Sequence, residues 1–136
     1  MPIGIIQKVS EGYSPNEKIK IDYVGHKAAM RINVAEFEDH GHIVTYIPSL
    51  DLSAYGETKE ASLKMLFEEV IDDFFENIFK LPEAEVTKEL AKYGWVRGRI
   101  LRKNFSNNVF VDEKGILRNF NLPAETPIRI NTMATA

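Results

Sequence analysis

Two histidines separated by one residue form the only local group in this sequence whose side chains are typical metal ligands. His40 and His42 flank Gly41 and follow Asp39. Imidazoles two residues apart lie on one side of an extended strand, and a zinc site can use that arrangement. The pair has no clear third ligand, however, and the alternative interpretation is a polar hairpin tip. We therefore expect no metal and no cofactor.

A second group of reactive side chains consists of carboxylates within one apolar, periodic segment. Its members are Glu68, Glu69, Asp72, Asp73 and Glu76. Helical spacing places them opposite the apolar residues, where we expect solvated carboxylates rather than catalytic acids and bases. The sequence also contains no cysteine, no G-x-S-x-G, no P-loop and no G-x-G-x-x-G motif. We therefore predict that the protein is not an enzyme.

The segment 96–105, VRGRILRKNF, has a local positive charge. The whole chain contains 17 basic and 20 acidic side chains, and its net charge of −3 opposes non-specific attraction to phosphate backbones. Because no aromatic residue besides Phe105 is interspersed with these cations, we interpret them as solvated charges of a strand or loop. A phosphate-binding track is the alternative.

Hydrophobic periodicity defines the elements that must position these residues. Period-two alternation predicts strands over 18–24, 28–34 and 43–47. Pro48 ends the third strand because it has no amide hydrogen for a ladder. The segment 52–55 is short enough to be an edge strand or an extended connector.

A long amphipathic helix follows, with Thr58 as its N-cap and Pro82 beyond its end. Its apolar stripe is broader than one small sheet would cover. A second, short helix, with Thr87 as N-cap and Gly94-Trp95 as a Schellman-type end, should cover part of the remainder. In the tail we predict a hairpin of strands 108–111 and 116–120, and one more strand after Pro127.

The order of strand, hairpin, strand, connector and long helix resembles the HicB-like antitoxin family. The residues that carry the resemblance are Tyr46, Pro48, Leu50, Gly56, Thr58 and Ala61. The segment 87–95, with Gly94 and Trp95, is similar to the ending of HicB-like proteins that stand apart from the characterised pairs. The resemblance covers about half of the chain, residues 28–95.

This resemblance implies an α+β fold, in which a small antiparallel sheet packs against one long amphipathic helix. The fold would be partial ribonuclease-H-like, with a short second helix and a β-rich C-terminal extension. We place the HicB-like core at 18–95 and the extension at 96–136 of a single domain. The implied function is that of an antitoxin that blocks a small, basic, RNA-cleaving toxin.

The acidic residues of the long helix would match the charge of such a toxin. The alternative function is an orphan small-ligand enzyme, or a metal-dependent RNA-processing enzyme, that uses His40 and His42. The last forty residues have no helix-turn-helix or ribbon-helix-helix spacing, so we do not expect direct DNA binding.

The chain contains no predicted membrane span, because carboxylates interrupt its richest apolar stretch, around 65–79. The N-terminal residues lack the pattern of a signal peptide, and we expect a cytoplasmic protein. The surplus of apolar surface on the helix and on the tail strands predicts a homo-oligomer, most simply a two-fold dimer. The alternative is that the tail completes the sheet of its own chain.

Overall fold

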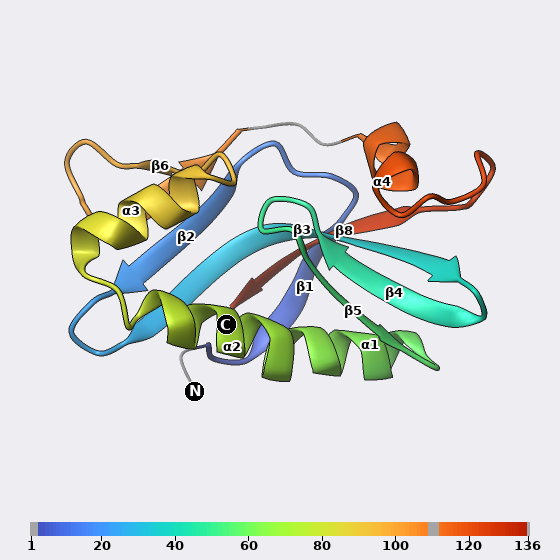
Figure 1. The fold of residues 1–136 in the computed structure, drawn as a ribbon, viewed down its shortest axis with the longest axis horizontal. Helices are drawn as coiled ribbons and strands as arrows, with labels where there is room; N and C mark the ends of the chain where they lie inside the picture. The colour runs from blue at the N-terminus through green and yellow to red at the C-terminus, as the bar shows by residue number, and fades with distance from the viewer. Residues whose placement is uncertain (1–2, 109–111, 136) are drawn as a thin grey trace.

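The longest strand, β3 (Lys27–Asp39), organises the sheet of this computed structural model, which describes residues 3–108 and 112–135 (Figure 1). On one edge β3 pairs with β8 (Arg129–Thr135), and β8 pairs with β1 (Ile6–Glu11). On its other edge β3 pairs first with β2 (Glu17–Asp22) and then, further along, with β4 (His42–Ile47). The edge of β3 therefore has a gap between β2 and β4.

Three shorter strands complete the eight-stranded sheet. β5 (Leu52–Gly56) pairs with β4, β7 (Asn104–Asn107) pairs with β2, and β6 (Val96–Arg97) pairs with β7. All the strand pairings are antiparallel. The expectation of an α+β fold with an antiparallel sheet is confirmed, and the sheet is larger than predicted.

A continuous 20-residue helix covers one face of this sheet. It comprises α1 (Lys59–Met65), a π-helical turn, η1 (Leu66–Val70), and α2 (Ile71–Ile78). Thr58 is its N-cap, as predicted, because the Thr58 Oγ1 accepts a hydrogen bond from the Ala61 N–H at 3.1 Å. The main core lies between this helix and the alternating inward residues of β2 and β3, such as Ile19, Ile21 and Ile32.

The second helix, α3 (Glu83–Ala91), begins earlier than predicted. Pro82, with φ −59°, occupies the N-cap, so the prediction of Thr87 as N-cap was wrong. Thr87 lies inside the helix. The end is confirmed: Gly94 has φ 92° and the Trp95 N–H donates to the Leu90 carbonyl at 3.1 Å, as in a Schellman motif.

A third helix, α4 (Glu113–Asn119), covers part of the opposite face of the sheet. The prediction of a strand over 116–120 was wrong, because Asp112 accepts a hydrogen bond from the Gly115 N–H at 2.8 Å and starts a helix there. Ile116 then packs against Phe37 and Tyr46 in a second core cluster. The partner strand predicted over 108–111 falls largely on residues 109–111, outside the described residues.

The tail strand β8 lies between β1 and β3, so the tail completes the sheet of its own chain. Of the two possibilities stated for the tail, the structure has the alternative, because β8 is paired on both edges within its own chain. β1, which was not predicted, forms the edge beside β8. The homo-oligomer stays a prediction. Within the described ranges, no helix is long and apolar enough to cross a membrane.

Candidate functional site

The two histidines lie at the tip of the β3–β4 hairpin. His40, with φ 51°, and Gly41, with φ 82°, form the turn between Asp39 and His42. The His40 Nδ1 lies 2.6 Å from the Asp39 Oδ1, whereas the His42 Nδ1 lies 3.3 Å from the His40 carbonyl oxygen. The described part of the chain contains no group of three or more side chains placed to hold a metal ion. This geometry is that of a polar hairpin tip.

The residues that resemble the HicB-like pattern hold the loop after β4 and the start of the helix. Tyr46 is buried and donates a hydrogen bond to the Asp51 Oδ1 at 2.8 Å. Burial, together with this bond, raises the pKa of the Tyr46 phenol to about 12. Pro48 lies in the turn that follows β4, and Leu50 is completely buried there.

Gly56 lies where β5 passes into the helix. A Cβ atom at this position would lie 2.8 Å from the Ser62 backbone nitrogen, so a side chain would force the helix away from the strand. The Ser62 hydroxyl contacts the Thr45 hydroxyl at 2.7 Å and donates to the Ala54 carbonyl at 3.1 Å. These residues therefore have structural roles, in fastening the helix to β4 and β5.

The gap between β2 and β4 contains a buried carboxylate, which the sequence analysis did not identify as a special residue. Glu17 is 4% exposed, and its Oε2 accepts from the Asn33 N–H at 2.9 Å and from the Ser49 hydroxyl at 2.8 Å. The Ser49 carbonyl in turn accepts from the Trp95 indole N–H at 2.8 Å. On the edge of β3 that faces the gap, the Glu17 Oε2 thus accepts from the Asn33 N–H in place of a strand carbonyl. Through Ser49 and Trp95, Glu17 also connects β3 to the end of α3.

Burial raises the pKa of Glu17, against the opposing effect of the hydrogen bonds from Asn33 and Ser49. The Asn33 side chain also holds the β1–β2 connection, with bonds of 2.8 Å to both the N–H and the carbonyl of Ser14. Because both atoms of the Asn33 amide and the Glu17 Oε2 are used inside the fold, we assign this cluster to structure rather than to ligand binding.

The acidic residues of the long helix do not all point to solvent. Glu68, Glu69, Asp73 and Glu76 are exposed, but Asp72 is only 7% exposed, and its Oδ1 is buried without a hydrogen-bond partner. The prediction that all five lie on the solvent side was therefore wrong for Asp72. Within α2, Asp72 stands three residues before Phe75 and seven before Phe79, so regular helical spacing already places it beside the apolar stripe.

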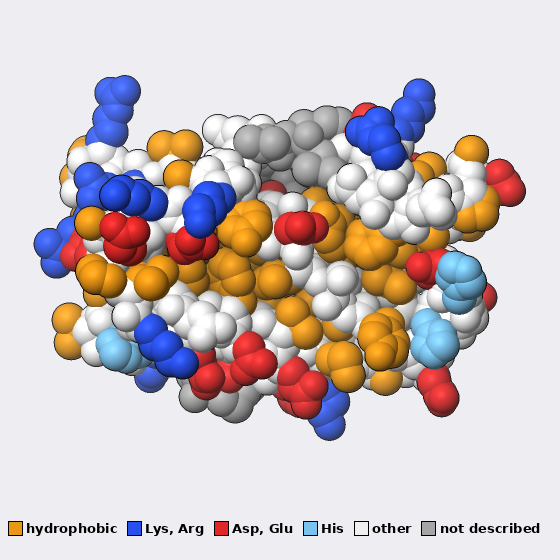
Figure 2. Space-filling view, viewed as in Figure 1, with side chains coloured by type: hydrophobic (Ala, Val, Ile, Leu, Met, Phe, Trp, Pro, Cys, Tyr) orange, Lys and Arg blue, Asp and Glu red, His pale blue; other side chains and the backbone are white. Residues whose placement is uncertain are grey.

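The same helix carries like charges at helical spacing. Asp72 and Glu76, both in α2, are four residues apart. Such a pair destabilises a helix by roughly 0.2–0.5 kcal/mol. No ion pair involves the four exposed carboxylates within the described residues. Figure 2 shows acidic side chains along the lower edge of the molecule, where α2 runs in Figure 1.

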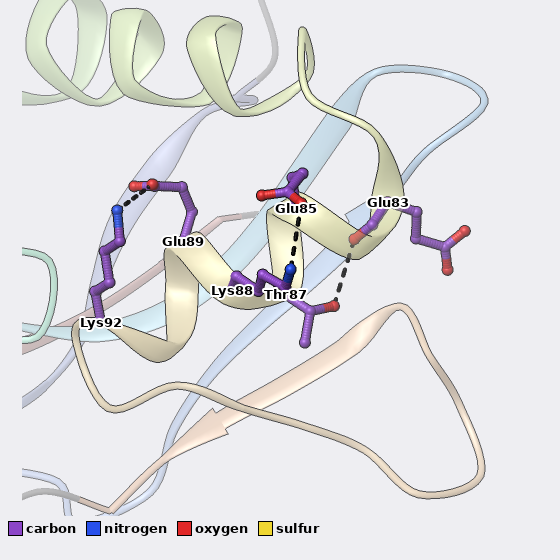
Figure 3. A network of polar contacts seen from close by, with 6 residues as sticks. All are labelled: Glu83, Glu85, Thr87, Lys88, Glu89 and Lys92. Atoms are coloured by element: carbon purple, nitrogen blue, oxygen red, sulfur yellow. Dashed lines mark hydrogen bonds and ion pairs between the residues drawn. The ribbon is translucent and has the colours of Figure 1, made fainter.

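The acidic residues of α3 behave differently (Figure 3). Glu85 pairs with Lys88 at 3.4 Å and Glu89 with Lys92 at 2.5 Å, each three residues apart. The bond from Lys92 to Glu89 raises the pKa of the Lys92 ammonium. Glu85 and Glu89 of α3 therefore have local cationic partners. The exposed carboxylates of η1 and α2 have no such partner within the described residues, so cations of another molecule can pair with them.

The basic segment forms β6 and the loop into β7. Arg102 pairs with Glu83 of α3 at 3.1 Å. Arg97, Arg99 and Lys103 are exposed. The segment therefore consists of exposed strand and loop charges, a placement that both sequence interpretations share, and it stands beside exposed aliphatic residues.

No protein-family model, curated protein or solved structure matches this chain. The exposed carboxylates of the long helix and Asp72 can attract and pair with ammonium or guanidinium groups, whereas the Nδ1 atoms of the two histidines contact oxygens of the hairpin tip itself.

Proposed function

We propose that this chain is a non-enzymatic binding protein that holds a small basic protein against the acidic side of its long helix. The observation that carries the proposal is Asp72, a buried carboxylate with an unpartnered Oδ1 among four exposed carboxylates of one helix. A buried carboxylate oxygen without a hydrogen-bond donor costs folding free energy, and a cationic side chain of a partner would offset that cost. The exposed carboxylates would speed association with such a partner.

The resemblance to HicB-like antitoxins supports a specific partner class, a small RNA-cleaving toxin. A toxin that binds RNA carries a basic surface, and an acidic surface is complementary to it in charge. The π-helical turn adds support, because such turns occur frequently at functional sites and this one contains Glu68 and Glu69. The alternative enzyme function would use His40 and His42 together, and their Nδ1 atoms contact different groups, the Asp39 carboxylate and the His40 carbonyl.

The proposal is tested with the small basic protein encoded by the neighbouring reading frame. Titration calorimetry of that protein into the full chain, at about 0.15 M salt, should give a one-to-one complex. The variant Glu69→Lys/Asp73→Lys should weaken it at least tenfold. The control Glu11→Lys/Glu125→Lys makes the same change in net charge at exposed positions outside the long helix, and should weaken it less than threefold.

Two results would overturn this proposal. Equal weakening by both double variants would mean that only net charge matters. Absence of a neighbouring frame for a basic protein, or absence of binding by its product, would remove the antitoxin interpretation.

A further inference from the structure

One end of the molecule carries two turns whose aliphatic side chains are almost fully exposed. Val24, in the β2–β3 turn, is 96% exposed, and Ile100, in the loop between β6 and β7, is 94% exposed. Leu101 beside it is 51% exposed. Both turns lie at the left end of Figure 1. We call these three residues and their two turns the apolar tip.

The two turns of the apolar tip are held side by side by the sheet. β2 pairs with β7, the Ile21 N–H donates to the Lys103 carbonyl at 2.8 Å, and the Tyr23 hydroxyl donates to the Arg102 carbonyl at 3.3 Å. The loop is also closed on itself, because the Gly98 N–H donates to the Asn104 carbonyl at 2.7 Å. The exposed aliphatic residues are therefore presented together, on an ordered support.

Cations surround the apolar tip. Lys27, Arg97, Arg99, Arg102 and Lys103 are all exposed, and only Arg102 is in an ion pair within the described residues. The sequence has no acidic residue from 90 to 111. Figure 2 shows Lys and Arg side chains gathered at this end. The neighbouring acids of α3 are already paired, Glu83 with Arg102 and Glu85 with Lys88.

An open groove of about 900 Å³ lies between the two turns. Its walls include Tyr23, Val24 and Leu101 together with the cations Lys20, Lys27 and Arg102. The only acidic residue in its lining is Asp22, whose carboxylate accepts from the Gly25 N–H at 2.9 Å. The groove therefore has the chemistry of a site for an anionic group, directly beside the aliphatic side chains.

We propose that the apolar tip docks on an anionic lipid surface, with Val24, Ile100 and Leu101 inserted among the acyl chains. The surrounding cations would then lie at the depth of the anionic headgroups, and the groove would receive one of these headgroups. A surface that binds only phosphate backbones needs cations but gains nothing from exposed aliphatic tips. A bilayer uses both, since apolar burial and attraction to anionic lipid add together in interfacial binding.

The charge distribution explains how a chain of net charge −3 could approach such a surface. In Figure 2 acidic side chains lie along the lower edge of the molecule and Lys and Arg side chains gather at its left end, so the molecule can orient this basic end toward the lipid. Fields of this kind act within about 10 Å at moderate salt, which confines the attraction to the nearest charges.

The test is sedimentation of the full chain with vesicles of phosphatidylcholine alone and with vesicles that contain phosphatidylserine. We expect binding to the anionic vesicles and at least tenfold weaker binding to the neutral ones. Ile100→Ser should weaken binding to anionic vesicles about tenfold, and Arg99→Gln/Lys103→Gln by a similar factor. Because these residues are exposed, the variants should keep the unfolding midpoint of the natural chain.

Matched controls separate binding at the apolar tip from non-specific adsorption to vesicles. Tyr55→Ser changes another exposed large side chain, 62% exposed on β5, and Lys64→Gln/Lys88→Gln removes two exposed cations from helices; both should bind as the natural chain does. Absence of binding to anionic vesicles would overturn the proposal. Normal binding of Ile100→Ser to anionic vesicles would also overturn it. In that case, if the natural chain and Ile100→Ser bound an oligonucleotide equally well, the tip would be identified as a site for polyanions instead.

Discussion

Glu17 and Asp72 are two buried carboxylates of the same chain, on the sheet and on the long helix, and their surroundings differ. The Glu17 Oε2 accepts hydrogen bonds from Asn33 and Ser49, at the gap between β2 and β4. The Asp72 Oδ1 has no hydrogen-bond partner in the part of the chain that the structure describes. Burial is similar, at 4% and 7% exposure, so the donors and not the burial distinguish the two sites.

This difference separates a structural carboxylate from one with a proposed role in binding. A buried acceptor with donors can contribute to stability, because removal of the acceptor leaves those donors unpaired. A buried acceptor without donors costs stability in the isolated chain. The cluster around Glu17 serves the fold by joining β2, β3 and the end of α3. The Asp72 Oδ1 makes no such connection between described elements, which is why we propose that a cation of a partner binds it.

The largest effect is expected for Glu17→Ala. This change leaves the Asn33 N–H and the Ser49 hydroxyl without their acceptor inside the protein, and should lower the free energy of unfolding by about 2–4 kcal/mol. Urea denaturation at neutral pH measures it. Glu36→Ala is the control, since Glu36 is also on a strand but only contacts Lys59 at 3.8 Å, and should cost less than about 1 kcal/mol. Equal costs would show that the donors of Glu17 do not matter.

A smaller effect, which depends on pH, is expected for Glu17→Gln. Burial raises the pKa of Glu17 above its ordinary value of 4.5, so the folded state binds this proton more tightly than the unfolded state. The proton that Glu17 binds therefore stabilises the folded natural chain fully below the unfolded pKa, and this stabilisation is lost as the pH rises through the folded pKa. Glutamine does not titrate, so the stability of the variant relative to the natural chain should rise from about pH 4 upward.

Denaturation series from pH 3.5 to 8 check this expectation, and Glu36→Gln is run in parallel. The difference between the natural chain and Glu17→Gln should change by no more than about 1.4 kcal/mol per pH unit, the limit for one proton. A difference that stays constant over the whole range would contradict a raised pKa.

The sequence predicted those elements whose signals are local. Alternation placed Ile19, Ile21 and Ile32 in the core, Thr58 marked the start of the long helix, and Gly94 marked the end of α3. In each case neighbouring residues decide the outcome. The same alternation also contained the signal for Glu17, because a glutamate two residues before Ile19 occupies an inward position of β2.

The remaining features depend on contacts between distant parts of the chain. α4 packs where Ile116 contacts Phe37 and Tyr46 on the far face of the sheet. The residues next to Ile116 in the sequence do not indicate that this face is there to be covered. The apolar tip exists because β2 pairs with β7, which brings together turns about 75 residues apart.

The smallest effect is expected when the charge of Asp72 is removed. Asp72→Asn keeps the shape of the side chain but removes a buried charge and its like-charge pair with Glu76, and should raise the free energy of unfolding by about 1 kcal/mol. Asp73→Asn makes the same chemical change at the neighbouring exposed position and should stay within about 0.5 kcal/mol of the natural chain. Urea denaturation of both variants, at the same pH and salt, measures the difference. A loss of stability in Asp72→Asn would show that the carboxylate already serves the fold as Glu17 does, and the main support for the acidic binding site would then be gone.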